Sequence, residues 1–357
     1  MLTSYGWTER RQHDFQTHAA NGLVPGRVIV QQRERYRLAT EAGEIDAVAG
    51  GKLRHEAELP VAGDWVAASP PATGAGGGPA VIRGVLPRTS AFVRRAAGPG
   101  GGAQVAAANV ETALLVASLN ADLSLRRLER YLAIAYESGA DPVIVLTKAD
   151  ACDDVAALTA EVSAIAFGTP VLAVSAVTGE GLAQLSAQLT PGRTAVLLGS
   201  SGVGKSTLVN ALVGAERMAT KAIIEAGARG RHTTTHRELV RLPGGGLILD
   251  TPGMRELGLW DAEAGLSAAF DDVEQLAAGC RFGDCRHAGE PGCAVQAAIA
   301  GERLAPERLA SWRKLQKEAA YEARRDDPLA AQAERRRWAA IHKEARGWIK
   351  AKRDIGD

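Results

Sequence analysis

Two nucleotide-binding signatures occur in this chain in an order that constrains its fold more than any other feature. Residues 199–206 read Gly-x-x-x-x-Gly-Lys-Ser, between an apolar segment and a segment of helical character. This pattern is typical of a loop whose backbone N–H groups and following helix N-terminus bind phosphate. A guanine-recognition pattern, Lys-x-Asp at residues 148–150, precedes the loop, whereas it ordinarily follows it. The sequence therefore predicts a circularly permuted nucleotide-binding domain.

Length and composition are those of a globular protein with two or three domains. The chain has 357 residues, of which 46% are hydrophobic and 23% charged. No apolar run approaches the roughly 20 residues that span a bilayer. Residues 1–18 are polar and lack the hydrophobic core of a signal peptide. We therefore expect a cytoplasmic protein without a membrane segment, and nothing in the sequence suggests more than a monomer.

The first part of the chain is expected to form a small all-β barrel. Short apolar segments alternate there with Gly- and Pro-rich connections, which is typical of such barrels. The barrel is placed at residues 23–97, after an N-terminal extension, 1–22, to which no role is assigned, and before a linker, 98–107. The five expected strands cover residues 27–31, 35–39, 45–48, 64–68 and 80–86.

The pattern changes in residues 108–260 to apolar strands that alternate with helices. Such alternation is typical of an α/β domain with a largely parallel sheet. The remainder, residues 261–357, reads as helical around a Cys/His cluster. In the α/β domain, strands are expected at 112–117, 142–146, 171–175, 194–198, 238–241 and 247–249, and helices at 125–138, 181–189 and 205–213.

The phosphate-binding loop supplies groups that hold a nucleoside triphosphate and its metal. Lys205 is expected to reach the β- and γ-phosphates and to stabilise the charge that develops during hydrolysis, and the Ser206 hydroxyl to bind Mg²⁺. Asp250 begins an Asp-x-x-Gly sequence after an apolar strand and is expected to hold the same Mg²⁺ through water. The candidate contact residues of the loop are Gly199, Ser200, Ser201, Gly202, Val203, Gly204, Lys205, Ser206 and Thr207.

Guanine rather than adenine is predicted from the sequence Thr-Lys-Ala-Asp. The Asp150 carboxylate can accept hydrogen bonds from N1–H and the exocyclic amine of guanine, an arrangement that adenine lacks. The Lys148 stem can lie across the base, and Thr147 replaces the usual Asn with a shorter polar side chain. The candidate guanine-binding residues, which end two successive strands, are Thr147, Lys148, Ala149, Asp150, Ser175 and Ala176.

Two segments near these motifs are expected to respond to the γ-phosphate. Thr234, with Thr235 as the alternative, is expected to complete the Mg²⁺ sphere, and Gly253 belongs to the second switch. Met254 follows, where many GTPases carry a Gln that orients the attacking water. We therefore expect slow intrinsic hydrolysis, with His232 as the candidate side chain that orients the water.

Three cysteines and one histidine form a compact metal-binding pattern, C-x4-C-x-H-x5-C. Three thiolates and an imidazole at this spacing suit a tetrahedral zinc ion with no open position, which indicates a structural metal. Disulfides are the alternative, and a cytoplasmic setting argues against them. The candidate zinc ligands are Cys280, Cys285, His287 and Cys293.

The net charge of +1 conceals basic regions near both ends of the chain. Residues 65–110 contain no acidic side chain, and residues 335–353 form a basic arm with interspersed tryptophans. Contact with RNA phosphates and a solvated protein surface explain these regions equally well; for the C-terminal region that surface would belong to a core-packing helix. The sequence leaves both interpretations open.

Together these motifs resemble those of the circularly permuted bacterial GTPases that depend on the small ribosomal subunit. The resemblance spans nearly the whole chain, and the permuted order combined with the zinc spacing is its most specific part. Thr147 in place of Asn, and Glu111 where relatives often have Asp, depart from the family pattern. The resemblance is carried by Gly63-Asp64-Trp65-Val66, Leu86-Pro87-Arg88, Ala108-Asn109-Val110, Gly230-Arg231-His232-Thr233-Thr234-Thr235, Asp250-Thr251-Pro252-Gly253-Met254-Arg255 and the Cys/His cluster.

The resemblance implies three domains: an N-terminal barrel of the oligonucleotide-binding (OB) type, a circularly permuted P-loop GTPase domain and a C-terminal helical zinc-binding domain with a basic arm. It also implies binding to the small ribosomal subunit and its rRNA late in assembly. GTP hydrolysis to GDP and phosphate would be stimulated by the subunit, serve as a maturation checkpoint and help to release assembly factors. The family's GTP contacts fall on residues 147–150 and 199–207, and its zinc ligands on the four residues of the cluster.

Other functions fit parts of the sequence. A GTP-binding, RNA-associated sensor with negligible turnover is compatible with Met254. A translation factor would also combine GTP hydrolysis with an RNA-binding barrel, but the permuted order and the zinc cluster count against it. An adenine-nucleotide enzyme is disfavoured by Asp150.

Overall fold

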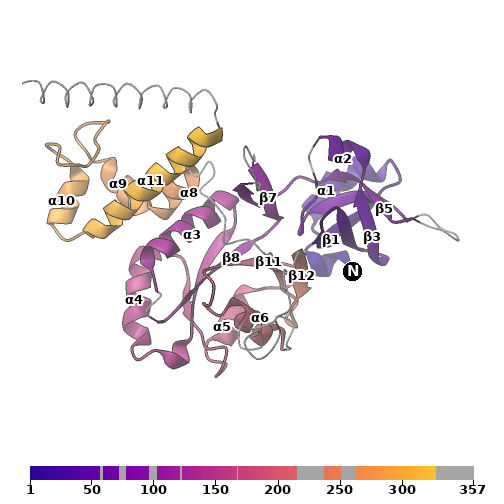
Figure 1. Ribbon diagram of the computed structural model, residues 1–357, viewed down its shortest axis with the longest axis horizontal. Coiled ribbons are helices and arrows are strands. Elements are labelled where there is room, and N and C mark those ends of the chain that lie inside the picture. Colours follow the sequence, from indigo (N-terminus) through magenta and orange to yellow (C-terminus); the bar gives the residue numbers. More distant parts are fainter. Residues whose placement is uncertain are drawn as a thin grey trace, which may run out of the picture.

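Three parts follow one another along the chain: a β-barrel, an α/β domain and a helical domain (Figure 1). The computed structural model describes residues 1–56, 59–71, 78–95, 103–120, 123–166, 168–214, 237–250 and 263–326. The barrel and the helical domain lie at opposite ends of the molecule, with the α/β domain between them (Figure 1). Within the described ranges, no helix is both long and apolar enough to cross a membrane.

The N-terminal domain is a closed five-stranded barrel of the OB type, and each of its five expected strands is present. The strands pair in the order β1-β2-β3-β5-β4, and β4 returns to pair with β1. The pairing of β4 with β1 closes the barrel, and inward side chains such as Val28, Leu38 and Val66 fill the interior. The elements are β1 (Val24–Gln32), β2 (Arg35–Thr40), β3 (Gly43–Ala49), α2 (Gly51–His55), β4 (Trp65–Ser69) and β5 (Ala80–Val85).

The N-terminal segment has a structural role that the sequence did not predict. It forms a short 3-10 helix, η1 (Leu2–Tyr5), and a helix, α1 (Glu9–Ala19), whose first turn is capped by the Thr8 hydroxyl. Leu2, Tyr5 and Phe15 are buried in the main core. The segment is too polar on average to indicate a core element, because only a few of its side chains point inward. Residues 1–22 are therefore an integral part of the fold.

The α/β domain contains a six-stranded sheet in the order β10-β9-β8-β11-β13-β12, parallel except for β12. All six strands expected from the sequence are present. Parallel strands buried on both faces read as continuous apolar runs, which is why their positions could be predicted. The strands are β8 (Thr112–Ser118), β9 (Asp141–Thr147), β10 (Val171–Ala173), β11 (Thr194–Leu198), β12 (Arg237–Arg241) and β13 (Leu247–Asp250).

Helices cover both faces of this sheet (Figure 1). Leu128 and Leu132 of α3 pack in one core cluster with Leu115 of β8, whereas Leu208 of α6 packs with the neighbouring Leu114 in another. Successive strand residues thus point to opposite faces. The helices are α3 (Leu125–Ser138), α4 (Val155–Ala166), α5 (Leu182–Gln188) and α6 (Lys205–Val213), and the short 3-10 helix η2 (Ala149–Ala151) follows β9.

A separate two-stranded hairpin connects the barrel to the α/β domain. It consists of β6 (Ala91–Arg95) and β7 (Ala103–Ala108), which pair with each other and with no barrel strand. The expectation of a linker at 98–107 is therefore wrong for residues 103–107, which belong to β7. Residues 98–102 lie outside the described ranges. Tertiary pairing with β6 makes this Ala-rich segment a strand, although its sequence has no period-2 pattern.

The C-terminal domain is helical over residues 263–326, as expected. No strand occurs within this range, and the basic arm at residues 335–353 lies outside the described residues. Helix α8 packs directly on α3, and a Cβ at Gly265 would lie 2.3 Å from the Ala133 carbonyl oxygen, so only glycine permits this approach. The helices are α8 (Glu263–Ala269), α9 (Asp271–Ala277), α10 (Ala294–Ala300) and α11 (Pro306–Asp326).

A buried ion-pair network joins the helical domain to the α/β domain. Arg308 of α11 donates hydrogen bonds to Glu129 of α3 at 2.7 Å and to Asp272 of α9 at 3.0 and 3.1 Å. Ser311 also donates to Glu129, and the Arg308 guanidinium lies 4.1 Å from the ring centroid of Phe270. Arg308 is 5% exposed and Glu129 is 3% exposed. The two domains therefore share a buried polar contact.

We expect Arg308→Ala to lower the free energy of unfolding by about 3–5 kcal/mol, because it leaves the Glu129 carboxylate buried without a cation. Arg303→Ala is the control, since Arg303 is exposed in the turn before α11, and its effect should stay within about 0.5 kcal/mol. Urea unfolding followed by circular dichroism measures both. Similar losses in the two variants would contradict the buried network.

Candidate functional site

The phosphate-binding loop lies between β11 and α6, as expected. Gly204 has φ of +92° and Gly202 has φ of +82°, a left-handed region that favours glycine. A Cβ at Gly199 would lie 2.4 Å from the Val116 carbonyl oxygen, so this glycine lets the loop approach β8 closely. The backbone can thus curve around an anion at the N-terminus of α6.

The side chain of Lys205 folds back over the loop. Its Nζ donates hydrogen bonds to the carbonyl oxygens of Gly199 at 2.7 Å and Ser200 at 2.6 Å. The ammonium group therefore lies at the loop, where a bound phosphate chain would meet it. Ser206 follows in the first turn of α6, half-buried, and the exposed Thr207 comes next.

The guanine-recognition segment contacts the phosphate loop directly, although the two are more than fifty residues apart in the sequence. The Thr147 hydroxyl lies 2.6 Å from the Val203 carbonyl oxygen and 3.2 Å from that of Ala117. Lys148, which adopts φ of +60°, donates from Nζ to the Gly202 carbonyl oxygen at 3.0 Å. The hydroxyl of Thr147 thus faces the loop and connects the guanine-recognition segment to it.

The Asp150 carboxylate is held by the strand end that follows in the sequence. Ser175 is fully buried, and its hydroxyl donates to Asp150 Oδ1 at 2.6 Å. The Ser175 oxygen in turn accepts from the backbone amides of Val177 at 3.2 Å and Thr178 at 3.1 Å. The exposed Asp150 side chain is therefore oriented by Ser175, and half-buried Ala176 lies in the same turn.

These segments meet at one edge of the sheet. Thr147 ends β9 and Asp250 ends β13, and the phosphate loop follows β11, which lies between β8 and β13. The carboxyl ends of parallel strands form the usual ligand-binding edge of an α/β sheet. Three further candidates, His232, Thr234 and Gly253, lie outside the described residues. The described candidates for nucleotide binding are thus brought together.

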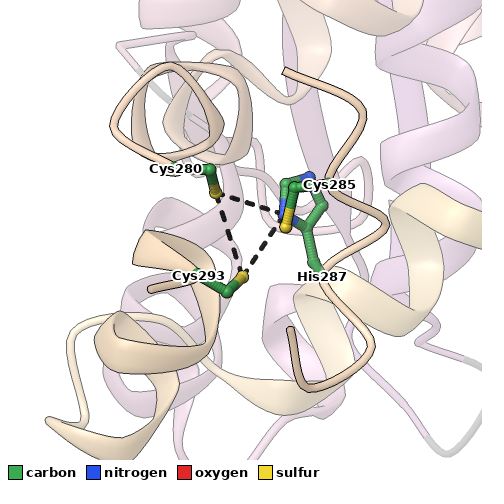
Figure 2. A group of neighbouring side chains, drawn as sticks. All are labelled: Cys280, Cys285, His287 and Cys293. Carbon is green, nitrogen blue, oxygen red and sulfur yellow. Dashed lines mark hydrogen bonds between the residues drawn. The ribbon is translucent and has the colours of Figure 1, made fainter. Parts of the chain in front are cut away.

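The four residues of the Cys/His cluster come together in the helical domain. Figure 2 shows their side chains pointing toward one another from the loop between α9 and α10. Their ligand atoms all lie within 4.8 Å of one another, and all four cysteines of the chain are free thiols. The structure therefore offers no disulfide, and it offers a group that could hold a metal ion. The cluster consists of Cys280, Cys285, His287 and Cys293.

The distances in the cluster fit a tetrahedral metal. His287 Nδ1 lies 3.5 Å from the Sγ atoms of both Cys280 and Cys293, and these two sulfurs are 3.9 Å apart. Metal–sulfur bonds of about 2.3 Å and metal–nitrogen bonds of about 2.0–2.1 Å at tetrahedral angles place such atoms about 3.6 and 3.8 Å apart. Nδ1 is therefore the imidazole atom that faces the ligand position.

Side chains that the sequence did not single out support this cluster. His287 has φ of +58°, and its carbonyl oxygen accepts hydrogen bonds from Gln296 Nε2 and, at 2.6 Å, from Arg313 of α11. Glu290 accepts from the backbone amides of Arg286 at 3.0 Å and Ala288 at 2.6 Å. The loop around His287 is thus fixed by its neighbours. The sequence offers no reason to select them, because their roles depend on contacts made in the folded chain.

Hydrogen bonds and burial shift the ionisation of groups in this loop. Backbone amides of Glu290, Arg286 and Ala288 lower the pKa of the Glu290 carboxyl group, which stays ionised. Burial raises the pKa of the Cys285 thiol to about 11. For Cys280, burial acts in the same direction but is outweighed by amides at the start of α10, and its pKa is lowered. A bound cation would favour the thiolate form of each cysteine.

The chain matches the model of the RsgA GTPase family over residues 85–260. Two relatives, each named small ribosomal subunit biogenesis GTPase RsgA, align along nearly the whole chain. The protein of Opitutus terrae is 48% identical over 355 residues, which cover 97% of this chain and 97% of that protein. The protein of Streptomyces coelicolor is 45% identical over 347 residues, which cover 96% and 91%.

Two solved structures share the fold. The structure of YjeQ from Thermotoga maritima has a TM-score of 0.63 and 28% identity, and the match covers 84% of this chain and 99% of that chain. The structure of YloQ, a circularly permuted GTPase, has a TM-score of 0.59 and 23% identity, covering 84% and 95%. The circularly permuted GTPase fold expected from the motif order is therefore confirmed.

We expect Thr147→Val to weaken binding of a fluorescent GDP analogue about five- to tenfold, because it removes the hydroxyl that bonds to the Val203 carbonyl. Thr147→Ser keeps the hydroxyl and is the matched control, with affinity expected within about twofold of the original protein. Fluorescence titration measures all three proteins. Unchanged affinity in the Val variant would show that the contact does not contribute to nucleotide binding.

Proposed function

The chain belongs to the RsgA GTPase family and is a GTP hydrolase, and we propose that it binds the small ribosomal subunit late in assembly and hydrolyses GTP there. The proposed partners are GTP or GDP and the small ribosomal subunit with its rRNA. We propose that the protein acts as a monomer in the cytoplasm. The relatives named above carry a small-subunit biogenesis role in their names and align over almost the entire chain. That alignment supports a shared partner.

The observation that carries the proposal is the contact between the guanine-recognition segment and the phosphate loop. Thr147 and Lys148 bond to carbonyl oxygens of the phosphate loop, which supports a guanine nucleotide site built from these two segments. Asp150 is oriented by Ser175 at the same edge of the sheet. A preorganised site lowers the cost of ordering groups on binding. This geometry supports GTP as the ligand.

The proposed reaction is phosphoryl transfer from GTP to water. The Lys205 ammonium and the N–H groups of the loop would stabilise charge on the transferring phosphate. Mg²⁺ bound with the nucleotide would neutralise further charge on the phosphate oxygens. Ser206, in the first turn of α6, and Asp250, at the end of β13, would hold the ion, because they offer the oxygen ligands that Mg²⁺ prefers.

In the proposed cycle, the change between the GTP and GDP states depends on the segments that precede β12 and follow β13. Thr234 and Gly253 would contact Mg²⁺ and the γ-phosphate while GTP is bound, and release them after hydrolysis. His232 is the candidate that orients water, in the absence of a Gln at Met254. Because the chain continues from Asp250 into the helical domain, nucleotide state can reach that domain directly. This coupling supports a maturation checkpoint that helps to release assembly factors.

The same proposal assigns a structural zinc ion to the Cys/His cluster. Three thiolates and one imidazole fill a tetrahedral sphere and leave no open position for chemistry. The supporting contacts from Gln296 and Arg313 connect the metal loop to α10 and α11. The ion would therefore hold the helical domain together, and the barrel and the basic arm would contact rRNA, chiefly through phosphates.

We expect purified small ribosomal subunits to raise the turnover rate of GTP hydrolysis more than about tenfold, because a partner supplies or places the water-orienting group that Met254 cannot provide. Phosphate release measured with small subunits, with large subunits and without either tests this. Ser206→Ala should abolish the stimulated reaction. Slow hydrolysis that neither subunit changes would instead indicate a GTP sensor with a different partner.

We expect one equivalent of zinc in the purified protein, and we expect Cys285→Ser to lose it and to lower the melting temperature. Affinity for GDP should change less than about twofold, because the cluster lies in a different domain from the nucleotide site. Cys152→Ser is the matched control, since Cys152 lies outside the cluster. Elemental analysis and thermal melting measure both variants. Full zinc content in Cys285→Ser would contradict the ligand assignment.

A further inference from the structure

The barrel and the GTPase domain form one continuous hydrogen-bonded sheet. Strand β1 of the barrel pairs antiparallel with β12 at Val30–Glu238 and Gln31–Arg237. On its other edge β12 pairs with β13, where Glu238 lies opposite Asp250. A barrel strand therefore lies only two strands away from the carboxylate proposed to hold Mg²⁺.

The side chain of Gln31 reinforces this short join. Its Oε1 accepts a hydrogen bond from Nη1 of Arg237 at 3.0 Å and another from the backbone amide of Ala62 at 3.3 Å. Ala62 lies in the connection that leads into β4 of the barrel. One amide oxygen thus ties the barrel to the first residue of β12. A hydrogen bond from a charged donor is stronger than one between neutral groups.

Arg237 depends on this acceptor. Its side chain is half-buried, and burial, followed by repulsion from Arg94, lowers the pKa of the Arg237 guanidinium. A partly desolvated cation is stabilised by a hydrogen-bond acceptor close by, and Gln31 provides one without adding charge. Loss of Gln31 would leave the first residue of β12 held to the barrel by strand pairing at only two positions.

We propose that Gln31 is a positioning residue for GTP hydrolysis, acting through Arg237 and β12 on Asp250. The inference rests on the proposed role of Asp250 in hydrolysis. It adds that the barrel helps to position this residue in the active site. The residue after Arg237 is the partner of Asp250 in the sheet. A shift at the start of β12 therefore moves the backbone next to the metal-binding carboxylate.

The consequence is a connection from the barrel surface to the hydrolytic site. A ligand that displaces the barrel also displaces β1, and β12 moves with β1 because the two strands share hydrogen bonds. Nucleotide affinity depends mainly on the phosphate loop and the guanine segment, which do not contact Gln31. The contact between Gln31 and Arg237 should therefore affect turnover and the requirement for Mg²⁺ more than the affinity for GDP.

The test compares Gln31→Ala, Gln31→Glu and the control Gln32→Ala in the full-length protein. Gln32 is the next residue of the same strand, has the same side chain and is exposed. We expect Gln31→Ala to lower kcat for intrinsic hydrolysis about five- to tenfold and to raise the Mg²⁺ concentration needed for half-maximal rate. KM for GTP, affinity for fluorescent GDP and melting temperature should stay close to those of the original protein. Gln31→Glu keeps the acceptor oxygen and should restore the rate.

Two results would overturn the inference: kcat in Gln31→Ala equal to that in Gln32→Ala, or parallel losses of kcat, GDP affinity and melting temperature that Gln31→Glu does not restore. All rates are measured without ribosomal subunits, so an absence of subunit stimulation bears on the proposed function alone. Asp250→Asn is measured alongside. If Asp250→Asn still hydrolyses GTP, both the inference and the metal role assigned to Asp250 lose their basis. If Asp250→Asn is inactive but Gln31→Ala hydrolyses GTP normally, only the inference is rejected.

Discussion

The buried guanidinium of Arg27 connects the barrel, the N-terminal segment and the GTPase sheet. It donates hydrogen bonds to the carbonyl oxygens of Tyr5 at 2.7 Å and Asn109 at 2.9 Å, and to the Thr194 hydroxyl at 2.9 Å. It also lies 4.9 Å from the ring centroid of Trp65. Burial lowers the pKa of Arg27 to about 10, so the group stays charged near neutral pH and needs these partners. Because Thr194 begins β11, the strand that leads into the phosphate loop is anchored to the barrel.

Asn109 completes the same junction. It adopts φ of +53°, and its Oδ1 accepts from Arg11 at 2.7 Å and from the Thr89 amide at 3.0 Å, while Nδ2 donates to the Gly63 carbonyl at 3.1 Å. A Cβ at Gly63 would lie 2.2 Å from the Ala108 carbonyl oxygen. Gly63, Thr89 and Asn109, which lie in or beside three of the short motifs, therefore meet at one place although they are far apart in the sequence. Their shared role is to fix the barrel against the GTPase domain. No single motif could indicate this role, because it depends on their contacts with one another.

Elements defined by local pattern were predictable from the sequence, and elements defined by distant partners were not. Helix α6 was expected at 205–213 and occurs at Lys205–Val213, because the glycine loop sets its start and apolar residues set its packed face. Strand β7 was missed because its stability comes from β6. In the candidate site, the phosphate motif and the guanine motif are each a continuous stretch of sequence, so both could be predicted. The bond from Thr147 to the Val203 carbonyl spans 56 positions and depends on the packing of three strands, so the sequence carried no sign of it.

The permuted chain order has a mechanical consequence for the nucleotide site. The phosphate half lies on β11, anchored to the barrel through Arg27. The guanine half follows β9, whose preceding helix α3 carries Glu129 and is bound to the helical domain through Arg308. Each flanking domain is thus attached to one half of the site. The hydrogen bond between Thr147 and Val203 joins these halves, so a partner that bound both flanking domains would act on the proposed nucleotide site from two sides. From these contacts we expect GTP hydrolysis to respond to the relative position of the two flanking domains.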